Sequence, residues 1–112
     1  MKTGTASFVC EMIDIILEYI PSKLAEARAG LKDGELGVVA SAFHSIKSSV
    51  GTIGAMKLKD LAAQIERLSK EKKMEVIPAL FEDFEKGYTQ VEKFLEMRRR
   101  ELDEGGPSSP SV

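Results

Sequence analysis

Apolar residues recur every three to four positions along almost the whole chain, and this helical period is what most constrains the fold. No stretch alternates polar and apolar residues as a half-buried β-strand would. Glycines and a lysine-rich turn divide the pattern into four segments, near residues 5–31, 35–51, 55–71 and 75–103. Each segment carries an apolar seam, and the connections are short. The sequence therefore predicts an all-α fold, an antiparallel four-helix bundle.

The first segment has a proline, Pro21, in its interior. Proline removes one backbone hydrogen bond and clashes with the preceding turn, so it kinks or splits a helix. The apolar seam nevertheless continues in phase on both sides, through Ile20 and Leu24. We therefore expect an N-terminal helical extension that is kinked or split near Pro21.

The chain of 112 residues is long enough for one domain, which we assign to residues 1–104. Residues 105–112 are rich in Gly, Pro and Ser, a composition that predicts a flexible C-terminal tail. No apolar run is long enough to span a bilayer, and the first residues do not have the pattern of a signal peptide. Together with a lone cysteine, Cys10, these features favour a cytoplasmic protein.

Charge and residue counts exclude several classes of function. With a net charge of −2, bulk attraction to nucleic acid or to an anionic membrane is not expected. The run 98–100, Arg-Arg-Arg, is favoured near a helix C-terminus by the helix dipole, and neighbouring acids offset its field. One Cys and one His exclude a disulfide and a Cys/His zinc site, and the Glu-x-x-His pairs of metal-binding bundles are missing. We expect no metal site and no bound cofactor.

The single histidine, His44, lies on the outward side of the second segment. At about 100° per residue, it falls roughly 150° from the centre of the apolar stripe of this segment. This position disfavours a core histidine and leaves an ordinary surface histidine as the simplest alternative. The stripe consists of Val39, Ala42, Phe43, Ile46, Val50 and Ile53.

The residues that share a helix face with His44 are all small, apart from Lys47. Exposed helix faces usually carry long polar side chains, so this clearing would let a second surface approach the imidazole. Lys47 leaves a cation beside any anion that the ring acquires. The arrangement suits transfer of a phosphoryl group to and from the ring between two proteins. The small residues are Gly37, Ala40, Ser41, Ser48 and Gly51.

The segment from His44 to Ala55 resembles the signature of the histidine-containing phosphotransfer (HPt) domain family. That signature has a His, two residues, a Lys and a Gly, with a Leu-Gly-Ala-like close ten residues after the His. The chain has Lys47 and Gly54 at the matching positions, and Ser48 where the family usually has Gly. The resemblance covers about residues 10–97 and implies a four-helix bundle.

The resemblance also implies roles for individual residues. His44 would accept the phosphoryl group, and Lys47 would be the cation that stabilises it. A polar side chain on the next helix holds the other imidazole nitrogen in this family, and the candidates here are Glu66 and Gln64. Helix phase places the two on opposite sides of the local apolar seam and does not choose between them, whereas the family alignment favours Glu66.

The implied function is that of a phosphorelay intermediate. A response-regulator receiver domain, or a hybrid sensor histidine kinase, would present an aspartyl phosphate with its own bound Mg²⁺, and His44 would take the group and pass it to another receiver. The chain lacks a Gly-rich nucleotide loop, so we expect a phosphoryl carrier and not an enzyme. The alternatives are a helical adaptor that binds a receiver or kinase without phosphoryl transfer, and a domain of a larger hybrid or chemotaxis-type kinase.

The first segment carries a second apolar stripe, about 110° from its core seam. A bundle helix needs only one stripe. Either the fourth segment wraps around this part and buries it, or the stripe, with Met12 and Ile15, belongs to a receiver-docking patch or a dimer contact. The stripe consists of Phe8, Met12, Ile15 and Tyr19.

Overall fold

The structure, a computed structural model, describes residues 5–103; residues 1–4 and 104–112, which include the predicted tail 105–112, lie outside the described residues. Within that range the chain is helical, and the predicted all-α four-helix bundle is confirmed. A short 3₁₀ turn, η1 (Met74–Val76), precedes the last helix. The helices are α1 (Thr5–Lys32), α2 (Leu36–Thr52), α3 (Met56–Lys70) and α4 (Ile77–Asp103).

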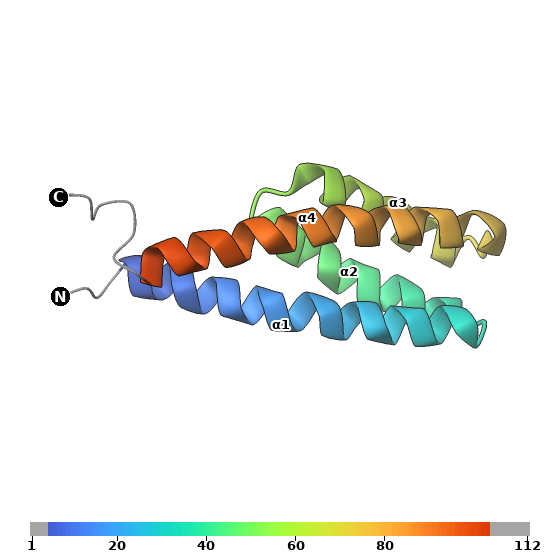
Figure 1. The fold of residues 1–112 in the computed structure, drawn as a ribbon. Coiled ribbons are helices and arrows are strands. Elements are labelled where there is room, and N and C mark those ends of the chain that lie inside the picture. The colour runs from blue at the N-terminus through green and yellow to red at the C-terminus, as the bar shows by residue number, and fades with distance from the viewer. Residues whose placement is uncertain (1–4, 104–112) are drawn as a thin grey trace, which may run out of the picture.

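The helices differ in length, and this shapes the bundle. α1 and α4 have 28 and 27 residues, whereas α2 and α3 have only 17 and 15. Figure 1 shows all four side by side at one end, with α1 and α4 continuing together past the others at the end near the termini. None of the helices described is long and apolar enough to cross a membrane.

The kink or split predicted at Pro21 is not seen, because α1 is one uninterrupted helix through this residue (Figure 1). Pro21 lies on the exposed side of α1, away from the core. The neighbouring Ile20 and Leu24 are buried in the core, with 0% and 5% of their surface exposed. Packing on both sides of the proline therefore holds the helix together at the cost of one backbone hydrogen bond.

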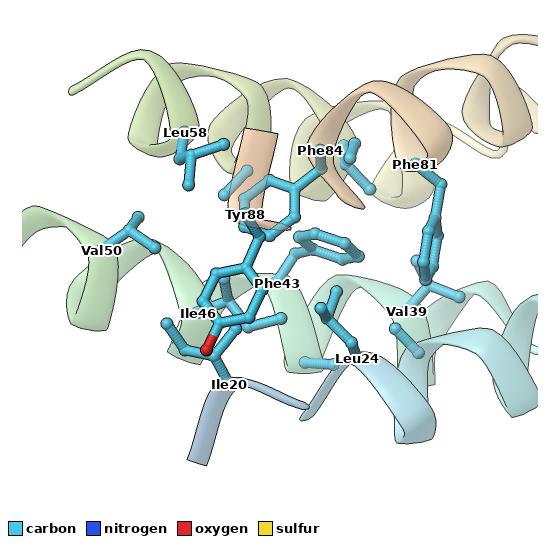
Figure 2. Packing of buried hydrophobic residues seen from close by; sticks show 14 of the residues in the cluster. Ile20, Leu24, Val39, Phe43, Ile46, Val50, Leu58, Phe81, Phe84 and Tyr88 are labelled. Atoms are coloured by element: carbon cyan, nitrogen blue, oxygen red, sulfur yellow. The ribbon is translucent and has the colours of Figure 1, made fainter. Parts of the chain in front are cut away.

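Phe43 of α2 lies at the centre of the core. Its ring meets Phe81 and Phe84 of α4 edge to face, with ring centroids 5.3 Å apart in each pair. Figure 2 shows the three rings together, with Ile20 and Leu24 of α1 below Phe43. A fully buried aromatic side chain contributes several kilocalories per mole by leaving water, so Phe43 fixes the rotation of α2 about its own axis.

The turn between α2 and α3 decides what faces His44. Gly54 has a φ of +77°, a left-handed conformation that glycine adopts without strain. The Ala55 amide donates to the Val50 carbonyl at 2.9 Å, which closes the end of α2. The chain then reverses, and α3 runs back along α2 and lies beside the face that carries His44 (Figure 1).

Candidate functional site

His44 is exposed, as the helix phase predicted. Its side chain retains 69% of its accessible surface, although it follows the fully buried Phe43. One step along the helix turns the side chain by about 100°, which takes it from the core to solvent. A second protein can therefore reach the ring without any change in the bundle.

The ring of His44 is held by a buried carboxylate from α3. Nδ1 of His44 lies 3.0 Å from Oε2 of Glu66, whose side chain is only 7% exposed. The other carboxylate oxygen, Oε1, accepts a hydrogen bond of 2.9 Å from Nζ of Lys47. Nζ of Lys70 lies 3.1 Å from Oε2. Two lysines and the histidine therefore surround one carboxylate.

Glu66 is ionised at neutral pH. Burial by itself raises the pKa of this carboxyl, and the hydrogen bonds from Lys47, Lys70 and His44 outweigh it and lower the pKa to about 2. A buried carboxylate is tolerated when it is paired and fully hydrogen-bonded, and this one has three donors.

The charge on Glu66 determines which nitrogen of His44 is free. An ionised carboxylate only accepts hydrogen bonds, so the proton in the contact with Glu66 belongs to Nδ1 of His44. In a neutral imidazole the other nitrogen, Nε2, then carries the lone pair. When the ring is neutral, Nε2 is therefore the nitrogen without a proton, on a side chain that an approaching partner can reach.

The structure separates the two candidates for the partner of the imidazole. Glu66 is buried against His44, whereas Gln64 is exposed and has no hydrogen bond to the ring. Lys70 is a member of the cluster that the sequence analysis missed. It lies four residues after Glu66 on α3, a spacing that places the two on one helix face and could have indicated the pair.

Only some of the small residues predicted to leave open surface around His44 are exposed. Ser41 and Ser48 are exposed, and a side chain at Gly37 would meet nothing within 4 Å, so this part of the clearing is open. Ala40 differs, because it is buried with 6% of its surface exposed. Gly51 also differs, since the side chain of Lys59 from α3 lies 3.4 Å from where its Cβ would be. Both face α3 and not open solvent.

The second apolar stripe of α1 is not covered by α4. Phe8 and Ile15 are 66% and 64% exposed, so of the two alternatives, burial by the fourth helix does not hold for these residues. α4 instead contacts the opposite flank of this part of α1, where Arg99 donates two hydrogen bonds to the Asp14 carboxylate. Phe8, Met12 and Ile15 line a shallow hollow that is completed by Ser49 and Thr52 of α2.

An exposed imidazole held by a buried carboxylate on a helical bundle is the arrangement expected of a phosphoryl carrier, and comparison with known families places the chain in that class. Residues 11–99 match the family model described as Hpt domain. The chain therefore belongs to the HPt family, whose members are histidine phosphotransfer intermediates in phosphorelays, carriers and not kinases. Membership implies receiver-domain partners in two-component signalling.

Among solved structures, the fold is similar to that of histidine-containing phosphotransfer protein B (HptB) from Pseudomonas aeruginosa PAO1. The TM-score is 0.79 and the sequence identity 21%, over 81% of this chain and 79% of the other. A search of curated protein sequences found no match.

Proposed function

We propose that His44 is the phosphoryl-accepting residue of this HPt domain, with Lys47 as the cation beside the group and Glu66 as the residue that positions the ring. The observation that carries the proposal is the contrast within one contact. The imidazole of His44 is 69% exposed, while the carboxylate that holds its Nδ1 at 3.0 Å is 7% exposed. A fixed ring with a free nitrogen toward solvent is what a nucleophile needs.

The transfer step follows from this geometry. Nε2 of His44 attacks the phosphorus of an aspartyl phosphate, so the N–P bond forms while the bond from phosphorus to the aspartate oxygen breaks. The electron pair of that bond leaves on the aspartate carboxylate. The ring keeps its proton on Nδ1 and gains positive charge, which the ionised Glu66 stabilises at hydrogen-bond distance. The reverse step passes the group to another receiver domain.

The partner we propose is a response-regulator receiver domain, which brings its own Mg²⁺ to neutralise the phosphoryl oxygens. A hybrid sensor histidine kinase is a second source of the group. We propose a cytoplasmic location, with neither nucleic acid nor a membrane as partner. A net charge of −2 supports the absence of a nucleic-acid or anionic-membrane partner.

We further propose that the receiver docks on the face formed by α1 and α2 beside His44. Phe8 and Ile15 are large apolar side chains, more than 60% exposed, next to the half-buried Met12. The hollow that they line reaches Ser49 and Thr52, on the same helix as His44. Exposed apolar side chains gathered around a shallow hollow are typical of a protein-binding surface.

The test is transfer from a labelled receiver. A receiver domain from the same organism is phosphorylated with a radioactive label and mixed with the chain and with its His44→Gln variant. We expect acid-labile, alkali-stable label on the wild-type chain and none on the variant, while both bind the receiver. Label on the variant would show that another residue accepts the group. Binding without any label on the wild type would instead indicate the helical adaptor.

A further inference from the structure

The carboxylate of Glu66 contacts two lysine ammoniums, although one would neutralise its charge. Its single negative charge is met by Nζ of Lys47 at 2.9 Å and by Nζ of Lys70 at 3.1 Å. The two lysines bind different oxygens, and Lys70 shares Oε2 with His44. With the histidine neutral, the cluster carries one net positive charge. The second ammonium is therefore unexplained by the resting state alone.

The two lysines differ in where else they can reach. Lys47 lies three residues after His44 on α2, so its ammonium shares the helix face of the imidazole. Lys70 lies on α3, one turn beyond Glu66, so it reaches the carboxylate from the same helix and not from the helix of His44. A phosphoryl group on Nε2 of His44 would bring two negative charges close to Lys47. At the same distance, an ammonium is attracted more strongly to a dianion than to the single charge of a carboxylate.

Movement of Lys47 toward a phosphoryl group would break its bond to Glu66. If Lys47 were the only cation on Glu66, its departure would leave a carboxylate that is 7% exposed without a partner, at a large cost in free energy. The second ammonium removes that cost, because Lys70 stays within hydrogen-bond distance of Oε2. The surplus charge thus becomes matched once the imidazole is phosphorylated.

We propose that Lys70 is a positioning residue that keeps Glu66 paired and aligned on His44 when Lys47 turns from Glu66 to the phosphoryl group. The inference rests on the proposed function of His44 and deepens it. It assigns the two lysines different roles: Lys47 exchanges partners during the cycle, and Lys70 does not. Without Lys70, Lys47 is divided between two anions, and the phosphorylated state alone is penalised.

The first test uses the wild-type chain and needs no receiver. His44 is phosphorylated chemically with phosphoramidate, and the side-chain ammonium signals of the lysines are followed by ¹⁵N NMR. We expect the Nζ signal of Lys47 to move on phosphorylation and that of Lys70 to stay in place. An unmoved Lys47 signal, or a displaced Lys70 signal with Lys47 fixed, would overturn the proposal.

The second test measures how label divides at equilibrium between the chain and a receiver. Lys70→Met should shift the ratio toward the receiver by about fivefold, the scale of one lost charge-assisted hydrogen bond. Lys70→Arg should restore it to within about twofold, since Arg also pairs with a carboxylate. Lys57→Met removes a charge from an exposed site on the same helix, outside the cluster, and should leave the ratio unchanged.

A Lys70→Met variant that partitions label like Lys57→Met would contradict the proposal. Lys70 is 66% exposed, so its replacement should leave the bundle folded, which circular dichroism would verify. The outcomes also separate the two proposals. If the wild type takes no label from any receiver, the proposed function fails. If it takes label and the Lys47 signal does not move, only the role of Lys70 fails.

Discussion

Phe43 and His44 are consecutive residues of α2, and the first is fully buried while the side chain of the second is 69% exposed. The pair links the core to the site. The edge-to-face packing of Phe43 on Phe81 and Phe84 sets the rotation of α2, and that rotation holds His44 at the surface opposite Glu66.

Phe43→Ala should destabilise the bundle by about 3–5 kcal/mol, because it removes a buried ring and leaves a cavity. Urea unfolding followed by circular dichroism measures the loss. Phe94→Ala removes the same ring from a site that is 62% exposed and should change the free energy of unfolding by less than about 1 kcal/mol. Equal losses for the two variants would mean that Phe43 does not anchor the core.

Glu66→Gln should slow transfer from a phosphorylated receiver to His44 by about tenfold. The amide can still accept a hydrogen bond from Nδ1, and it no longer offers a charge to the ring that becomes cationic. The initial rate of labelling measures the effect. Gln64→Ala is the matched control, since Gln64 is exposed on the same helix, and it should label at the wild-type rate. A slow Gln64 variant with a normal Glu66 variant would reverse the assignment.

The acid stability of the chain should depend on Glu66. Its pKa is lowered from 4.5 to about 2 in the fold, so the folded state binds this proton less readily than the unfolded chain. The resulting stability is fully present above about pH 4.5 and is lost as the pH falls toward 2. The loss should be roughly 3 kcal/mol, because the pKa is lowered by about 2.5 units and each unit corresponds to 1.36 kcal/mol.

Urea unfolding at a series of pH values, compared between the wild type and Glu66→Gln, isolates this contribution from the other carboxylates. The wild type should lose the additional free energy between these limits and the variant should not. Parallel curves over that range would show that Glu66 titrates as an ordinary carboxyl.

Ile15→Asp should weaken receiver binding by about tenfold and leave the fold intact. Ile15 is 64% exposed, so a charge there costs the bundle little and would be buried without a partner in the proposed interface. Isothermal titration calorimetry measures the affinity. Met12 is half-buried and packs against the core, so Met12→Asp should also lower stability.

Phe94→Asp provides the control for Ile15, because it places the same charge on an equally exposed apolar residue of α4. It should bind the receiver normally. Chemical phosphorylation of His44 by phosphoramidate should proceed at the same rate in both variants, since a small donor does not use the docking face. If both variants bind equally well, the α1–α2 face is not the docking surface.

Local and periodic features were readable from the sequence. Helix bounds fell within two residues of the predicted ones because apolar period and glycine breakers act over a few residues. The outward position of His44 followed in the same way, since a helix turns by a fixed angle and Phe43 belongs to the buried stripe. These conclusions needed no contact between distant segments.

The outcomes at Pro21 and at Glu66 depended on tertiary packing, whereas the pair of Glu66 and Lys70 lies within one helix at i, i+4 spacing. The sequence predicted a kink or split at Pro21, and burial of Ile20 and Leu24 outweighed one missing hydrogen bond. Helix phase left Glu66 and Gln64 equivalent, because both flank the seam of α3 at similar angles. Only the placement of α3 against α2 brought Glu66 to 3.0 Å from His44.

By itself, then, the sequence determined the helices, their buried faces and the exposure of the one imidazole, since each depends on the fixed geometry of a single helix. The tertiary structure decided which side chain holds that imidazole, and it brought the Lys47 ammonium to the same carboxylate. Such contacts join residues 19 and 22 positions apart, and their distances depend on how two helices pack. Periodicity within one helix carries no information about that packing.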